Sequence, residues 1–258
     1  MVLRVASYNV RSMKDDVGAL ERVVAALRAD VLCVQEAPRF LRWRRKRVRL
    51  AAFGGLSVVA GRRRGGVAVL AGPGVRVVHG EGHLLQPFLG LERRAIAIGV
   101  VESDGWRAAV GSVHLDLDET ARVRHAAEAL ALLRATADRF DALPVLAGDI
   151  NEQADQPGWR HLTERLTDCY PVSPRGAGLT FPARGPHLRI DAIFAAPDLS
   201  VVSCGDAGAD PADLVAATDH LPVIAELTCA DPGGIGGAGE AARDLGSGLG
   251  RHGAGENR

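Results

Sequence analysis

The sequence has 258 residues, of which 47% are hydrophobic and 24% charged, and its formal net charge is zero. These values are typical of a soluble globular protein, and the absence of any apolar run long enough to cross a bilayer excludes a transmembrane segment. The length favours one sizeable domain with a proper core. Because the amino terminus runs directly into an alternating strand pattern, without the layout of a signal peptide, we expect a cytoplasmic protein.

The four cysteines are widely scattered and show no zinc-type pairing, so we expect free buried thiols rather than disulfides. The first elements in chain order are a strand, a helix and a second strand. Residues 3–8 alternate and stop at Asn9, and an amphipathic helix capped by Asp15 or Asp16 follows, with its stripe from Val17 to Leu27. The second strand, at 31–35, is continuously apolar and ends in Glu36.

A basic segment follows Glu36. No acid occurs between Ala37 and Gly80, whereas the same stretch carries ten arginines and one lysine. Such a face can bind phosphates by releasing their counterions, although a solvated helix face balanced by nearby acids is an equal alternative. We expect Phe40, Leu41 and Trp43 to form the anchoring side of this segment.

Meandering strands occupy the middle of the chain. Residues 56–60 and 67–71 predict an antiparallel hairpin, and further strands are expected at 75–78, 94–101 and 106–115. The last of these ends in His114. Asp116 and Glu119 then resemble a capping box that starts a long helix reaching Phe140.

The stretch from Pro144 to Asn151 predicts a buried strand that ends in an acid and an amide. Asp149 and Asn151 are two positions apart, so they point to the same side if the strand geometry persists. The carboxyl end of a strand is where α/β sites gather their chemistry, but such residues are often only turn residues that bond their own backbone.

The later chain is mostly loop, with three predicted elements. A short helix starts at Pro157 and buries Trp159, and strands follow at 188–194, interrupted by Asp191, and at 221–227, preceded by Asp219 and His220. Residues 230–258 are dominated by glycine and have little to pack, so we expect a disordered tail after a single domain at 1–229.

Polar residues stand at or near the ends of these predicted strands, and most of them are oxygen donors. Carboxylates and amides without cysteine suit a hard cation such as Mg²⁺ or Mn²⁺, and two histidines supply hydrogen-bond donors and charge for a developing oxyanion. This mixture fits phosphoryl chemistry. Each residue alone has a structural alternative, such as a cap, an ion pair or a satisfied core histidine. The set comprises Asn9, Glu36, His114, Asp149, Asn151, Asp191, Asp219 and His220.

Six segments in this order and spacing resemble the signature blocks of the endonuclease/exonuclease/phosphatase superfamily. The resemblance covers about residues 1 to 228 and identifies the fold and chemistry better than the substrate. It implies an α+β fold, a four-layer α/β/β/α sandwich of two mixed sheets flanked by helices. The blocks are residues 7–11 (SYNVR), 33–36 (CVQE), 111–114 (GSVH), 147–151 (AGDIN), 189–194 (RIDAIF) and 218–223 (TDHLPV).

The resemblance also implies a role for each residue. Glu36 matches the principal metal ligand, with Asn9 and Asp219 beside the metal or the phosphate. Asp149 matches the residue that orients or deprotonates the attacking water, and Asn151 the one that holds the phosphate. His220, oriented by Asp191, matches the histidine that stabilises the transition state, and His114 matches a second catalytic histidine. Arg11 stands where some members carry an acidic metal ligand, and we assign it to the substrate phosphate.

We therefore expect a monomeric enzyme that uses Mg²⁺ or Mn²⁺ and water to cleave phosphodiester bonds. The basic segment favours nucleic acid, DNA or RNA, as the substrate. The alternative is a phosphatase or phosphodiesterase acting on an inositol phosphate, a nucleotide or a lipid head group, and a catalytically silent binding module is a third hypothesis. The sequence leaves open whether cleavage is internal or terminal and whether one or two metal ions take part.

Overall fold

The computed structural model describes residues 2–229, so the predicted tail at 230–258 lies outside the described residues. Two mixed β-sheets pack face to face. The seven-stranded sheet contains, in spatial order, β10 (Pro174–Arg175), β12 (Leu199–Gly205), β13 (Val223–Cys229), β1 (Leu3–Asn9), β2 (Val31–Gln35), β4 (Ala68–Ala71) and β3 (Ser57–Ala60). The six-stranded sheet contains β5 (Arg76–Leu84), β6 (Ala95–Ser103), β7 (Trp106–His114), β8 (Leu143–Asp149), β11 (Asp191–Ala195) and β9 (Thr167–Asp168).

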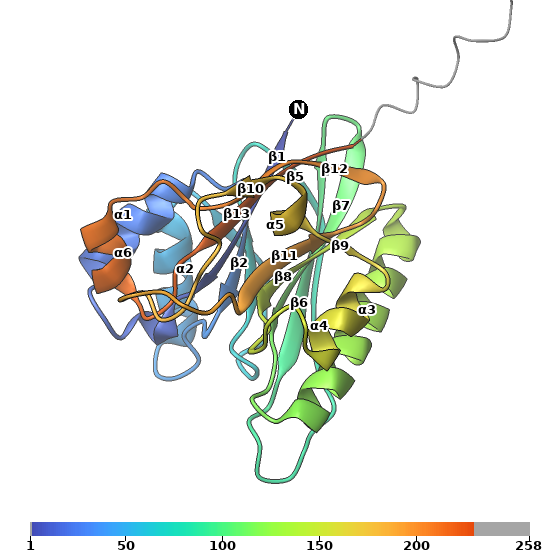
Figure 1. Cartoon of the computed structure of the whole chain (residues 1–258). Helices are drawn as coiled ribbons and strands as arrows, with labels where there is room; N and C mark the ends of the chain where they lie inside the picture. Colours follow the sequence, from blue (N-terminus) through green and yellow to red (C-terminus); the bar gives the residue numbers. More distant parts are fainter. Residues whose placement is uncertain (1, 230–258) are drawn as a thin grey trace, which may run out of the picture.

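Helices cover the outer face of each sheet, which confirms the four-layer sandwich. Figure 1 shows α1 (Val17–Leu27), α2 (Trp43–Phe53) and α6 (Pro211–Ala217) on one side, and α3 (Glu119–Phe140) and α4 (Pro157–Thr163) on the other. The short α5 (Cys169–Val172) and a 3-10 turn, η1 (Arg11–Met13), complete the elements. Within residues 2–229, no helix has the length and apolar character needed to cross a bilayer.

Three apolar layers hold the sandwich together, and the alternation along β1 explains how. Leu3 and Val5 face the other sheet, whereas Ala6 and Tyr8 face the layer under α1. Asp16 caps α1 by accepting hydrogen bonds from the Gly18 and Ala19 amides, as predicted. Because side chains alternate along a strand, the inward face of β1 continues from Leu3 and Val5 to Ser7 and Asn9, and so changes from apolar to polar toward the carboxyl end.

Several elements differ from the sequence predictions. The N-cap of α3 is Asp118, which accepts a hydrogen bond from the Ala121 amide, so the predicted capping box at Asp116 is wrong. Asp116 instead accepts a hydrogen bond from the Asp118 amide. Strand β12 and helix α6 were not predicted. The side chains of β12 are partly exposed and α6 has only seven residues, so neither gives a strong pattern.

The basic segment also packs differently from the prediction. Phe40 and Leu41 are 65% and 82% exposed, so they do not anchor it, whereas the third predicted residue, Trp43, is partly buried and its ring lies against the Arg47 guanidinium. The anchors are Leu50 and Arg47, which are buried in α2; the Arg47 guanidinium donates to the backbone carbonyls of Pro38, Val67 and Arg62. The predicted hairpin is confirmed as the antiparallel pair β3 and β4. Cys33, Cys169 and Cys204 are buried free thiols, as predicted, whereas Cys229 is partly exposed.

Candidate active site

The site begins as a row of polar side chains across three neighbouring strands. His114 at the end of β7 lies in register with Asp149 at the end of the parallel strand β8, and Asp149 lies in register with Asp191 at the start of the antiparallel strand β11. The three side chains are buried, and they belong to the face of this sheet that packs on the other sheet. His114 Nε2 is 3.4 Å from Asp149 Oδ2.

The opposite sheet contributes Asn9 to this row. Its amide Nδ2 donates to Asp149 Oδ2 at 3.0 Å and lies 3.5 Å from both Glu36 Oε1 and His220 Nε2. Asn9 is thus the residue through which the two sheets meet at the site, although Asp149 is 140 positions away in the sequence. Glu36 directly follows β2 in the left-handed region, with φ 46°, and is half-buried. Such a conformation is costly for a residue with a side chain and is often found at functional sites.

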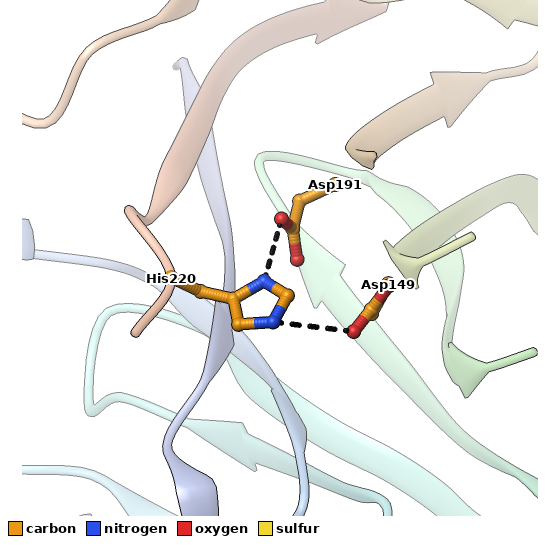
Figure 2. Close-up of side chains that lie close together, drawn as sticks. All are labelled: Asp149, Asp191 and His220. Carbon is orange, nitrogen blue, oxygen red and sulfur yellow. Dashed lines mark hydrogen bonds and ion pairs between the residues drawn. The ribbon is translucent and has the colours of Figure 1, made fainter. Parts of the chain in front are cut away.

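Asp191 and His220 form the most tightly bonded pair. His220 Nδ1 and Asp191 Oδ2 are 2.9 Å apart, and His220 Nε2 is 3.7 Å from Asp149 Oδ2, so the imidazole bridges the two carboxylates (Figure 2). The Phe181 ring packs on the imidazole, with centroids 4.8 Å apart. The second oxygen of Asp191, Oδ1, is buried and has no hydrogen-bond partner among the described residues.

Burial and neighbouring charge shift the proton affinities of these groups in different directions. Burial and the Asp191 charge raise the pKa of Asp149 to about 7. Burial lowers the pKa of His220, but the charge and hydrogen bond of Asp191 outweigh it and raise that pKa to about 9. Burial, reinforced by the Arg94 charge, holds the pKa of His114 well below its usual range. Near neutral pH the site therefore holds a proton on His220, a neutral His114 and a carboxyl at Asp149 that can accept or release a proton.

Asn151 lies beside Asp149, but not as a continuing strand would place it. Strand β8 ends at Asp149, and Asn151 has a left-handed φ of 57°, so the condition under which the two side chains would point to the same side is not met. The Asn151 amide N–H donates to Asp149 Oδ1 at 3.1 Å, and its Nδ2 donates to the Leu115 carbonyl at 3.0 Å. Asn151 therefore orients the Asp149 carboxylate and ties the loop after β8 to the loop after β7.

Asp219 and Arg11 form the exposed flank of the site. Arg11 Nε is 3.3 Å from Asp219 Oδ2, and Arg11 Nη1 is 3.3 Å from Asp15 Oδ1. The structure thus gathers all nine residues that the sequence predicted, with Asn9, His114, Asp149, Asp191 and His220 in the buried centre. The other four, Glu36, Asn151, Arg11 and Asp219, lie around it.

Among residues 2–229, the side chains that come closest to a metal-binding arrangement are Asp149, Asp191 and His220, whose ligand atoms lie within 4.8 Å of one another. The hydrogen bond between His220 Nδ1 and Asp191 Oδ2 opposes this use, because it engages one potential ligand atom of each of these two residues. Glu36 is the better candidate, since the described residues give its carboxylate only one long contact, to Asn9, and no ion pair.

Sequence reasoning missed the polar layer beneath the site. Gln35 donates to the Ser112 hydroxyl at 3.2 Å and lies 3.3 Å from the Ser7 hydroxyl, which joins the two sheets directly below Asn9 and His114. Thr180 Oγ1 accepts from the amides of Ile190 and Asp191 and fixes the start of β11. Only the burial of these residues distinguishes them from ordinary strand serines and glutamines, so the signal was not available in the sequence.

Two buried ion pairs support the loops that carry the site. Arg122 of α3 pairs with Glu152 at 2.8 Å and donates to the carbonyls of Asp116 and Leu117, so it braces the loops after β7 and β8 together. Arg94 pairs with Asp116 at 3.3 Å and links the start of β6 to the same loop. Buried charges are costly unless paired, so these contacts hold the loops in one arrangement.

Comparison with known proteins assigns this architecture. A search of curated proteins finds no match. Solved structures with the same fold include an endonuclease/exonuclease/phosphatase protein from Bacteroides vulgatus, with 19% identity and a TM-score of 0.71, covering 89% of this chain and 100% of that chain. A mannosyl-6-phosphatase from Bacteroides thetaiotaomicron has 19% identity and a TM-score of 0.72, covering 88% of this chain and 99% of that chain. The human Nocturnin catalytic domain with bound sulfate is also similar, with 17% identity and a TM-score of 0.67, covering 89% of this chain and 95% of that chain. The profile of the Endonuclease/Exonuclease/phosphatase family matches residues 6–220, and the chain therefore belongs to this family.

Proposed function

We propose that this chain is a divalent-cation-dependent hydrolase that cleaves phosphodiesters by in-line attack of water. The observation that carries the proposal is the buried Asp149 carboxylate, which is held by Asn9 and Asn151 between two histidines. A carboxyl with a pKa of about 7 is matched to accepting a proton from water near neutral pH. Asp149 is accordingly the proposed base.

The other central residues provide charge and orientation. His220 carries a proton and directs its Nε2 toward the site, so it can stabilise negative charge that develops on the phosphoryl oxygens. Asp191 fixes the ring from the other nitrogen. The neutral His114 can donate one hydrogen bond to Asp149 or to the substrate.

The oxygen-rich edge of the site fits a hard cation. Glu36, which has no cationic partner among the described residues, would hold Mg²⁺ or Mn²⁺ together with the Asn9 side chain, and Asp219 would contribute from the flank where it now pairs with Arg11. The bound cation would supply Lewis acidity and neutralise negative charge on the phosphate. Arg11 would then be free to bind the substrate phosphate.

Nucleic acid is the first substrate candidate, because the basic segment beside Glu36 contains eight exposed cations that form no ion pair with any described carboxylate. They are Arg42, Arg44, Arg45, Lys46, Arg49, Arg62, Arg63 and Arg64. The second candidate is a phosphorylated small molecule or lipid head group. The exposed apolar side chains of Phe40 and Leu41 within that same segment favour a lipid, because neither is needed to bind a soluble polyanion.

The test is hydrolysis of a soluble aryl phosphodiester and of single- and double-stranded DNA, with Mg²⁺, with Mn²⁺ and with chelator. Asp149→Asn and His220→Ala should each reduce turnover at least about a hundredfold, while retaining the fold. Asp155→Asn is the matched control, because Asp155 is exposed just beyond the site. Turnover that persists in chelator, or an unchanged rate in Asp149→Asn, would refute the proposal.

A further inference from the structure

The exposed leucine and phenylalanine side chains of residues 2–229 lie on three loops. Phe40 and Leu41 (65% and 82% exposed) belong to the connection between β2 and α2, the fully exposed Leu89 to the one between β5 and β6, and Leu117 (75%) to the one between β7 and α3. The remaining large apolar side chains that are exposed are valines. Exposed apolar side chains that lie together on one face mark interaction sites, whereas isolated ones are ordinary.

All three loops lie at the edge of the sandwich that carries the active site. Glu36 and His114 directly precede two of them. The third begins and ends at this edge as well, because Ile96 of β6 lies in register with Val113 of β7. Figure 1 shows the β5–β6 loop projecting beyond the sheets beside the start of α3. We call these three loops, residues 37–42, 85–94 and 115–118, the apolar rim.

Polar contacts fix the bases of the rim loops and leave their tips free. Arg39 pairs with Glu92 at 2.9 Å and so joins the first loop to the second. The Gln86 amide donates to Glu128 of α3 at 2.8 Å, and the Gln86 carbonyl lies 2.8 Å from His125 Nε2. The leucine side chains therefore face solvent on loops whose bases these contacts hold, and they gain nothing from burial in the protein.

Positive charge surrounds one side of the rim. The exposed side chains of Arg42, Arg44, Arg45, Arg64 and Arg93 form no ion pair with any carboxylate in the described part of the chain. The carboxylates of the rim are Glu92, which is paired with Arg39, the buried Asp116, and Asp118, which caps α3. The face therefore combines aliphatic tips with excess cations.

We propose that the apolar rim docks on the surface of an anionic phospholipid bilayer and so presents the active site to phosphodiesters held there. Aliphatic side chains gain free energy by entering the acyl region, whereas the surrounding arginines meet the head-group charge. Three of the four exposed apolar side chains of the rim are leucines, which have no flat ring on which a base could stack, and this favours lipid over nucleic acid for this surface. The choice of substrate rests on the proposed hydrolase; the docking itself does not.

The test is co-sedimentation of the full chain, in chelator, with vesicles of phosphatidylcholine alone and of phosphatidylcholine mixed with phosphatidylserine. The protein should sediment with the mixed vesicles. Leu41→Ser with Leu89→Ser should lower the partition coefficient at least about tenfold, because each leucine loses its transfer into the bilayer. Val77→Ser with Val202→Ser, which alters two exposed valines outside the rim, should leave it unchanged.

Charge is tested separately. Arg44→Gln with Arg45→Gln should weaken binding to mixed vesicles by about fivefold per charge, whereas Arg134→Gln, on the exposed side of α3, should not. Absence of vesicle binding, or binding that ignores the leucine substitutions, would overturn the inference. Binding to duplex DNA that depends on Arg44 and Arg45, in a chain that does not bind the mixed vesicles, would assign these arginines to nucleic acid instead. Because the soluble diester assay is independent of vesicles, hydrolysis without sedimentation refutes only the docking, and sedimentation without hydrolysis refutes only the enzyme.

Discussion

Replacing Asp191 by Asn removes the charge that keeps His220 protonated while retaining an oxygen that can accept its hydrogen bond. The two groups are 2.9 Å apart, and their side chains are only 1% and 8% exposed, so solvent screens them little. Unit charges about 4 Å apart at an effective dielectric constant of about 20 interact by about 4 kcal/mol, or about 3 pKa units, and measured shifts from such neighbours are about 1 to 3 units. We expect the pKa of His220 to fall from about 9 by that amount.

In the proposed mechanism the protonated form of His220 is the active one, and this sets the sign of the effect on activity. In the native chain, turnover of a soluble phosphodiester should fall as the pH rises through about 9. In Asp191→Asn the same decline should occur about 1 to 3 units lower. An NMR titration of the His220 ring reports the shift directly, and the ring signals of His161, which pairs with Glu164 on the surface, should be the same in both proteins.

The reasoning would be refuted if turnover of Asp191→Asn declined at nearly the same pH as that of the native chain and the pKa of His220 in the NMR titration were unchanged. This result would show that the Asp191 charge does not control the imidazole and that the pair serves only to position β11 beside the segment before β13. A loss of activity at all pH values, with no change in the pH at which turnover declines, would likewise assign Asp191 a structural role.

Two further predictions concern how the site is supported. Arg122→Met should lower the free energy of unfolding in urea by about 3 to 5 kcal/mol, because it leaves the Glu152 charge buried without a partner. Adding Glu152→Gln should recover part of that loss. A double variant whose losses are strictly additive would contradict the pairing. Gly148→Ala should cost about 3 kcal/mol or more, since a Cβ at this position would lie 2.1 Å from the Val113 carbonyl oxygen. Gly18→Ala, on the surface of α1, is its control and should be nearly neutral, so equal losses in the two variants would contradict the steric argument.

Local patterns in the sequence were enough for the elements with strong periodicity. The apolar stripe and acidic cap of α1 and the continuous apolar run of β2 predicted those elements with nearly the observed bounds. The polar residues at the strand ends predicted the candidate site, because an acid or amide after a buried strand can be recognised without knowing its neighbours. The ordered blocks that contain them gave the family and hence the layers, which the profile match over residues 6–220 confirms.

Weak or ambiguous local signals explain the errors. Asp116 and Asp118 both precede α3, and only the backbone geometry decides that Asp118 is the cap. An asparagine two residues after an aspartate is compatible with a strand and with a turn, so the sequence does not decide the backbone at Asn151. Its left-handed conformation accompanies its contacts with Asp149 and Leu115. Phe40 and Leu41 look like anchors in sequence, but Arg47 occupies the buried position instead.

The sequence by itself predicted which side chains form the candidate site, since residue type and position after a strand are local properties. Only the tertiary structure decided their partners and proton affinities. Asn9 reaches Asp149 across 140 positions because two sheets pack at that edge, and the pKa values of Asp149 and His220 follow from burial beside Asp191. Burial and charge proximity are properties of the packed sandwich, because they arise from strand pairings between segments distant in the chain.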